Sequence, residues 1–189
     1  SDGGVHSHIN HLFSLLELMK KEKVKDVYIH IFTDGRDVNP TSGIKYIEAL
    51  EKKIKSLGVG QIASISGRYY GMDRDNRFDR VEKSYLVMTK KSEVKEVKKV
   101  WQDSQKEGIT DEFIIPTATC ENAIITDNDG IIFFNFRPDR LRELASIFTN
   151  DDYKCFDREK INNLKVVTMM PVTDTVLCPS AFQLQKLDN

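Results

Sequence analysis

Apolar residues along the chain follow two different spacings, which predict two kinds of element. Short runs that are apolar throughout, or alternate apolar and polar residues, predict strands. These runs lie at 27–33, 61–66, 112–116, 131–136 and 164–170. Stripes of apolar residues three or four positions apart predict helices instead. These stripes lie at 12–19, 44–57, 78–88, 94–101 and 138–148.

The predicted strands and helices alternate, and this order is typical of α/β proteins. We expect a three-layer α/β/α sandwich with a mostly parallel central sheet. The sequence DNDG at 127–130 lies between two strand-like runs and is also typical of a hairpin, so the sheet could be mixed. Ser42 and Gly58 are expected to begin and end the second helix. We expect one domain over residues 1–170, followed by a connecting segment at 171–189.

The composition is that of a water-soluble globular domain. Hydrophobic residues make up 40% of the chain and charged residues 30%, and the formal net charge is −1. No apolar run approaches the roughly 18 residues that a membrane span requires, and a signal-peptide pattern is absent. We therefore expect a cytoplasmic protein without membrane partners. A nucleic-acid partner is also not expected, because no broad basic face is predicted.

The cysteines predict neither a disulfide framework nor a zinc site. Cys120, Cys155 and Cys178 are odd in number, and none forms a CxxC pair. We interpret them as ordinary buried or incidental thiols.

The arginines gather just after predicted strands. Arg36 follows the first strand, Arg68, Arg74, Arg77 and Arg80 follow the second, and Arg137 and Arg140 follow the run at 131–136. The carboxyl ends of parallel strands meet at one edge of a sheet, where ligands bind. The guanidinium group is always charged and donates two parallel hydrogen bonds to a carboxylate or phosphate. The pattern therefore predicts a site for a small anion.

Neighbouring aspartates allow a second interpretation of this pattern. The arginines could pair in surface networks with Asp34, Asp37, Asp73, Asp75, Asp79 and Asp139. This interpretation suits Arg77, Arg80 and Arg142 best, because they could point outward along helices. Asp37 fits charge balance least well, since it follows a strand beside Arg36, as a general base would. Asp34 precedes a glycine and is expected to form the turn.

Histidines near the N-terminus raise the question of a metal site. Asp2, His6, His8 and His11 could supply ligands. Helical spacing, however, would bring His8 and His11 together and turn His6 elsewhere, so we favour one histidine at the helix start and others exposed to solvent. Gly3 and Gly4 precede His6 and allow close approach of a ligand, so His6 could donate to a phosphate or transfer a proton.

Five blocks of sequence resemble a known family. They are SDGGVHSHINHL (1–12), FTDGRDVNPTSG (32–43), ISGRYYGMDRDNRFDRV (65–81), DEFIIP (111–116) and IIFFNFRPDRLREL (131–144). In order and spacing they resemble the substrate-binding, or phosphotransferase, domain of cofactor-independent (2,3-bisphosphoglycerate-independent) phosphoglycerate mutase. These enzymes interconvert 3-phosphoglycerate and 2-phosphoglycerate through a phosphoserine intermediate, in glycolysis and gluconeogenesis. Their other domain resembles alkaline phosphatase and carries two metal ions, usually manganese, and the nucleophilic serine.

The resemblance implies a set of substrate-binding residues. They are His6, Arg36, Asp37, Arg68, Arg74, Arg137 and Arg140. Asp37 matches the catalytic acid or base that moves a proton between the two hydroxyl groups of glycerate. Arg36, Arg68 and Arg74 match the residues that hold the carboxylate and hydroxyls. Arg137 and Arg140, with His6, match the residues that hold the phosphate.

The resemblance also implies what this chain lacks. No histidine follows His30 and no serine has the nucleophile context, so neither the metal site nor the nucleophile is expected here. We expect a monomer that binds phosphoglycerate, holds no cofactor itself and is inactive without a missing metal-binding domain with its two manganese ions. Residues 171–189 resemble the return linker to that domain only loosely. A stand-alone phospho-acid binding module and a metal-dependent phosphoesterase are the alternatives.

Overall fold

A computed structural model describes residues 1–183 of the chain. The elements are α1 (Ile9–Lys21), β1 (Tyr28–Thr33), α2 (Gly43–Leu57), β2 (Gln61–Gly67), α3 (Arg68–Gly71), α4 (Phe78–Thr89), α5 (Val97–Lys106), the 3-10 helix η1 (Asp111–Phe113), β3 (Thr117–Ala118), β4 (Gly130–Phe133), α6 (Arg142–Thr149) and β5 (Lys165–Thr168). No helix in this described part is both long and apolar enough to cross a membrane.

The strands form two small sheets within residues 1–183. β1 pairs in parallel with β2, and β2 pairs antiparallel with β3. β4 and β5 form a second, parallel pair. The sheet structure is therefore mixed, but residues 127–130 do not form the hairpin that was considered, because the strand that follows them pairs in parallel.

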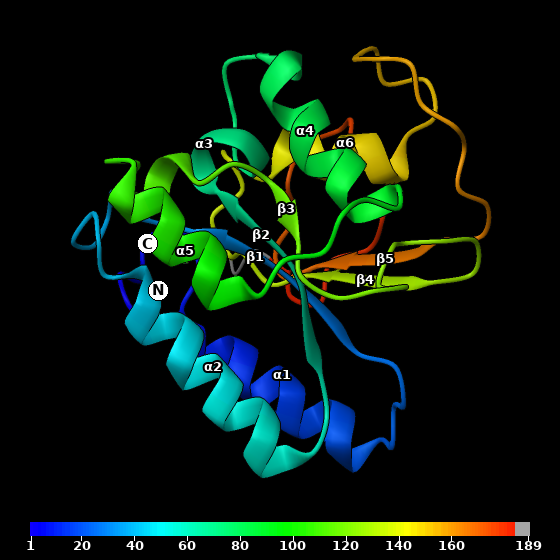
Figure 1. The fold of residues 1–189 in the computed structure, drawn as a ribbon. Coiled ribbons are helices and arrows are strands. Elements are labelled where there is room, and N and C mark those ends of the chain that lie inside the picture. Colours follow the sequence, from blue (N-terminus) through cyan, green and yellow to red (C-terminus); the bar gives the residue numbers. More distant parts are fainter. Residues whose placement is uncertain (184–189) are drawn as a thin grey trace, which may run out of the picture.

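Helices cover both faces of the strands, as Figure 1 shows: α1 and α2 lie on one side, and α4 and α6 on the other. Each side has its own apolar core. Leu16 of α1 and Ile47 of α2 pack on Ile65 of β2. On the opposite side, Val81 of α4 and Leu144 of α6 belong to a second buried cluster. Burying apolar residues on both faces requires a helical layer on each, so the predicted α/β/α class is confirmed.

The prediction of a strand at 112–116 is wrong. Asp111–Phe113 forms η1, and Ile114 continues in extended conformation without joining a named strand. Ile114 is fully buried, which explains the apolar pattern, and its carbonyl accepts the backbone N–H of Gly67 at 2.7 Å. The segment is therefore held at the end of β2, where its burial comes from packing.

The ends of α2 show one expected cap and one unexpected cap. Gly58 has φ +66° and its N–H bonds the carbonyl of Ile54, as predicted for a helix stop. The hydroxyl of Ser42 donates to the carbonyl of Asn39 instead of capping α2. The carboxylate of Asp111 accepts the N–H of Gly43 at 2.6 Å, so a residue distant in sequence caps the helix.

The last predicted helix begins later than its sequence pattern suggests. The stretch at 138–141 forms a turn, in which the N–H of Leu141 bonds the carbonyl of Pro138 at 2.9 Å, and α6 starts only at Arg142. This turn leaves Arg140 outside the helix. Its guanidinium can therefore reach the carbonyl of Met72, at 3.0 Å.

The segment after β5 folds back onto the domain. The carbonyl of Pro179 accepts the N–H of Thr168, and the carbonyl of Thr168 accepts the N–H of Ala181. The N–H of Phe182 then bonds the carbonyl of Met169. Residues 179–182 thus lie beside the end of β5, whereas residues 184–189 of the expected linker lie outside the described residues.

Candidate functional site

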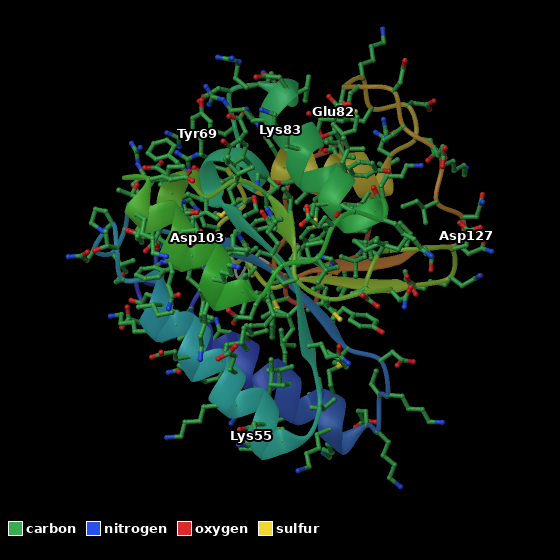
Figure 2. All side chains as sticks on the ribbon, viewed as in Figure 1. Lys55, Tyr69, Glu82, Lys83, Asp103 and Asp127 are labelled. Atoms are coloured by element: carbon green, nitrogen blue, oxygen red, sulfur yellow. The ribbon has the colours of Figure 1, made fainter. Side chains whose placement is uncertain are left out.

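The candidate site lies where β1 and β2 end. The two strands are parallel and Thr33 is the partner of Gly67, so the segments that follow them start side by side. The loop after β1 carries Arg36 and Asp37, and α3 begins with Arg68. Figure 2 labels Tyr69, the neighbour of Arg68, and shows it far from Lys55 at the other end of the molecule.

Arg68 is the centre of the site, with its side chain only 3% exposed. Its Nη1 donates to Asp34 Oδ1 at 2.8 Å and to Asp37 Oδ2 at 2.5 Å. Its Nη2 lies 3.0 Å from His6 Nε2. Burial acts to lower the pKa of Arg68, but the carboxylates of Asp37 and Asp34 outweigh burial and raise it. A charge buried in this way is stable only with these partners.

Asp34 forms the turn after β1, as the sequence predicted. Its Oδ1 accepts the backbone N–H groups of Arg36 and Asp37 at 3.2 and 3.0 Å, and its Oδ2 accepts the hydroxyl of Ser1. Burial opposes ionisation, but these hydrogen bonds and that from Arg68 together lower the pKa of Asp34. The turn therefore also places the side chain of Asp37 against Arg68.

Asp139 gathers charged groups from other segments. Its Oδ2 accepts a hydrogen bond from Arg74 Nη1 at 2.8 Å, and its Oδ1 lies 3.0 Å from Arg137 Nε and 3.5 Å from His6 Nδ1. Burial acts to raise the pKa of Asp139, but Arg74, Arg137 and His6 outweigh it and lower the pKa.

Arg36 and Arg140 complete the group of cations. Burial, followed by the charges of Arg68, Arg74 and Arg36, lowers the pKa of Arg140, so these guanidinium groups act on one another. Arg36 is 59% exposed and lies 3.3 Å from Glu112. The structure therefore brings all the predicted site residues to one edge of the fold, His6 and Asp37 included.

The aspartate pairing of the second interpretation occurs both among the site arginines and at Arg77 and Arg80. Arg77 pairs with Asp79 on the surface, and Arg80 pairs with Asp73 and stacks on the ring of Tyr69. Arg142 donates to the backbone carbonyl of Arg74. Arg80 and Arg142 thereby contact the segment that carries Arg74.

His6 is separated from the other polar residues of the N-terminal segment. His8 accepts the N–H of Asn10 at 3.1 Å and caps α1, which confirms one histidine at the helix start. Asp2 bonds the hydroxyl of Tyr46. Over the described residues, no group of three or more His, Cys, Asp or Glu side chains could hold a metal ion. These contacts do not favour a metal centre built from the N-terminal histidines.

The backbone of His6 is fixed by the loop after β4. Its carbonyl accepts the N–H of Phe136 at 2.9 Å, which places His6 beside the segment that carries Arg137. A side chain at Gly3 would lie 3.3 Å from the carbonyl of Asp37. The close approach that this glycine permits is therefore to the loop after β1.

Asp139 was considered only as a surface partner, although it binds two arginines and faces His6. A signal was present, because the sequence places Asp139 between Arg137 and Arg140. Periodicity does not show, however, that this aspartate turns toward His6. That contact depends on the turn at 138–141, which the pattern assigned to a helix.

A cavity of about 540 Å³ lies between α1, β1 and β4 and reaches Asp34 of the loop after β1. Its walls are mainly apolar, with residues such as Leu12, Ile31 and Phe133, and none of the site arginines lines it. We place the candidate site at the arginine cluster, because that is where the structure concentrates groups that bind anions.

Comparison with known proteins shows the family of the chain. Residues 1–174 match the family described as BPG-independent PGAM N-terminus. The chain belongs to this family. The matched residues include His6, Arg137 and Arg140. The match confirms the resemblance seen in the sequence.

A solved structure of a phosphoglycerate mutase is also similar. It is the crystal structure of Leishmania mexicana phosphoglycerate mutase at low cobalt concentration, with a TM-score of 0.86 and 28% sequence identity. The similarity covers 91% of this chain and 34% of the Leishmania chain. The chain therefore spans about a third of the length of that mutase.

Proposed function

We propose that the chain is the substrate-binding domain of a 2,3-bisphosphoglycerate-independent phosphoglycerate mutase. The complete enzyme would interconvert 3-phosphoglycerate and 2-phosphoglycerate, in glycolysis and gluconeogenesis, and would act in the cytoplasm. One observation carries the proposal: the residues that match the family's motifs converge at one edge of the fold, around the buried guanidinium of Arg68.

The cations suit a ligand with two anionic groups. Arg68 begins α3 directly after β2, Arg137 follows β4, and Arg74 and Arg137 both contact Asp139. We assign the carboxylate and hydroxyls of glycerate to Arg36, Arg68 and Arg74, and the phosphate to Arg137, Arg140 and His6. Charge-assisted hydrogen bonds of this kind contribute on the order of 1.5–3 kcal/mol each. Several of them would hold a small, strongly hydrated anion.

Asp37 is proposed to be the acid or base. It accepts a hydrogen bond from Arg68 at 2.5 Å, which fixes its side chain at the centre of the arginine cluster. Asp37 would take the proton of the attacking glycerate hydroxyl. As it does so, the oxygen of that hydroxyl would bond to phosphorus and the bond between phosphorus and the serine oxygen would break. Asp37 would return a proton to the other hydroxyl in the opposite step.

The nucleophilic serine and two manganese ions are proposed to belong to another domain. No cluster of metal-ligating side chains occurs among the described residues of this chain. Positioning and charge stabilisation dominate phosphoryl transfer, so a domain of arginines supplies part of the mechanism without turning over substrate. We therefore propose that this chain alone binds phosphoglycerate as a monomer and is inactive.

Titration of the chain with 3-phosphoglycerate tests this proposal, with and without manganese, followed by phosphorus NMR. We expect a saturable shift of the ligand signal and no 2-phosphoglycerate. Formation of 2-phosphoglycerate would contradict the assignment of the chemistry to another domain. No binding of either phosphoglycerate would contradict the assignment of the site.

Ligand preference distinguishes a mutase domain from a stand-alone phospho-acid binding module. Such a module is expected to bind a range of phosphorylated acids equally well, whereas a mutase domain should favour the two phosphoglycerates. 2-Phospholactate, a phosphorylated acid that lacks only the 3-hydroxyl of 2-phosphoglycerate, is the matched control ligand. Equal binding of this control and 2-phosphoglycerate would favour the module.

A further inference from the structure

The hydrogen-bond partners of His6 determine which ring nitrogen carries its proton. Nε2 lies 3.0 Å from Nη2 of Arg68, and the His6 residue is 7% exposed. A guanidinium group can only donate hydrogen bonds. Nε2 must therefore be the acceptor in this contact, and the neutral imidazole carries its proton on Nδ1.

Nδ1 of His6 faces Asp139. The distance from Nδ1 to Asp139 Oδ1 is 3.5 Å. Both atoms are buried, and neither has a hydrogen-bond partner within the described residues. A buried donor and a buried acceptor that face each other in this way are matched in chemistry, and a small movement would bring them within hydrogen-bond distance.

Two arginines also hold Asp139 in place. Arg74 donates to its Oδ2 at 2.8 Å, and Arg137 Nε lies 3.0 Å from Oδ1, the oxygen that faces His6. Asp37, the other carboxylate near His6, lies 3.8 Å from Nε2. Of the two carboxylates, only Asp139 faces the nitrogen that carries the proton.

We propose that Asp139 is a positioning residue that orients His6 through Nδ1–H and keeps the lone pair of Nε2 toward Arg68 and Asp37. Only the role of this His6 orientation in the reaction rests on the proposed function. In this orientation His6 can donate from Nε2 to the phosphate assigned to it only when the ring is protonated. Its Nε2 accepts hydrogen bonds beside the proposed acid or base, a role that the sequence pattern did not indicate.

NMR of the histidine ring nitrogens in the intact chain tests the proposal. The chain has four histidines, so the His6 signals can be assigned by comparison with His6→Gln. We expect Nδ1 to carry the proton, with a downfield Nδ1–H signal that exchanges slowly with water. Protonation of Nε2 in the neutral ring would overturn the proposal, whatever any variant shows.

The variant Asp139→Asn tests the carboxylate itself. Burial lowers the pKa of His6, as does the charge of Arg68, whereas Asp139 and Asp37 act to raise it. Asp139→Asn should therefore lower the pKa of His6 further and remove the downfield signal. Asp139→Glu retains the charge and should restore part of both. An unchanged His6 pKa and Nδ1–H signal in a folded Asp139→Asn protein would also overturn the proposal.

Asp79→Asn is the matched control, because Asp79 pairs with Arg77 on the surface. It should leave both His6 observables unchanged. Emission from the single tryptophan, Trp101, reports whether each variant is folded. If Asp139→Asn does not fold, the tautomer of His6 in the wild-type chain decides the proposal. None of these measurements uses phosphoglycerate, so failure of the proposed function is a separate result.

Discussion

At the scale of single residues, Arg68 shows why guanidinium is needed in this site. One buried side chain bonds Asp34 and Asp37 through Nη1 and reaches His6 through Nη2. Lysine has one nitrogen and cannot present two donor groups in a planar fork. Charge alone would therefore not reproduce the arrangement of these three residues.

Replacing Arg68 with lysine should weaken 3-phosphoglycerate binding. Loss of a charge-assisted hydrogen bond, worth on the order of 1.5–3 kcal/mol, corresponds to roughly 10- to 100-fold in Kd. Calorimetric titration measures this change. Arg77→Lys is the control, because Arg77 pairs only with Asp79 among the described side chains, and its Kd should match wild type. Equal affinity of Arg68→Lys and wild type would exclude Arg68 from the site.

His30 should make stability depend on pH. Burial lowers its pKa from 6.5 to about 4, so below about pH 6.5 the unfolded chain binds a proton that the folded chain does not. The free energy of unfolding should therefore fall by on the order of 3 kcal/mol as pH drops from the ordinary pKa to the folded pKa.

Urea unfolding at several pH values measures this slope for wild type and His30→Gln. The variant should show a smaller slope, since no imidazole titrates at that position. His11→Gln, which removes an exposed imidazole, should keep the wild-type slope. Identical slopes for wild type and His30→Gln would contradict the prediction.

At the scale of elements, Asp111 joins four parts of the fold. Its carboxylate accepts the N–H of Gly43 in α2 and the indole N–H of Trp101 in α5, both at 2.6 Å. Its own carbonyl accepts the hydroxyl of Thr33 at the end of β1. The η1 segment thus connects the helical layer to the strand that leads into the site.

Asp111→Ala should destabilise the fold by roughly 2–4 kcal/mol, because it leaves the buried N–H of Gly43 and the partly buried indole N–H of Trp101 without an acceptor. Guanidinium unfolding followed by Trp101 fluorescence measures the change. Asp103→Ala removes an aspartate that pairs with Lys106 on the surface of α5, and should cause little change. Similar stabilities of the two variants would show that Asp111 does not join these elements as inferred.

Glu143 of α6 should give the opposite pH dependence to His30. The residue is 1% exposed, and its Oε1 accepts the N–H of Asn76. Burial raises the pKa of Glu143, and the nearby charge of Asp73 acts in the same direction. A raised folded pKa means that the stability contribution is present below the unfolded pKa of about 4.3 and is lost as pH rises through the folded value.

Glu143→Gln, which is always neutral, should therefore be more stable than wild type near pH 7, whereas the two should converge at about pH 4. Urea unfolding at both pH values gives the comparison. Glu159→Gln changes an exposed side chain and is the control. If the Glu143→Gln variant is less stable than wild type at neutral pH, the ionised carboxylate is needed to hold Asn76.

At the scale of the whole molecule, the segment 171–182 behaves as part of the domain. It makes backbone hydrogen bonds to both Thr168 and Met169, and Thr175 contacts Ser146 of α6. A chain ending at Met170 should lose about 2–3 kcal/mol of stability, since three backbone hydrogen bonds contribute about 1 kcal/mol each. Thermal unfolding measures this loss. A chain ending at Gln183 keeps these contacts and is the control; equal stabilities would indicate a connection that does not stabilise the domain.

The sequence predicted most elements because their patterns are local. Helix α2, for example, is predicted by its apolar stripe and by Gly58. The sequence pattern failed at 112–116 and at 138–141, where Ile114 and Leu141 are buried although neither lies in a strand or helix. Periodicity reports that a residue is buried, but it does not distinguish a strand from a packed turn.

The sequence by itself determined the family, the α/β class and the residues of the candidate site, because motifs and the arginines that follow strands can be read directly along the chain. Only the tertiary structure decided which charges meet: Arg68 with Asp34 and Asp37, and Asp139 with His6. These pairs join segments that the chain brings together only when the strands pair and the turns close. The partner of a charged side chain therefore depends on long-range packing, which local sequence patterns do not encode.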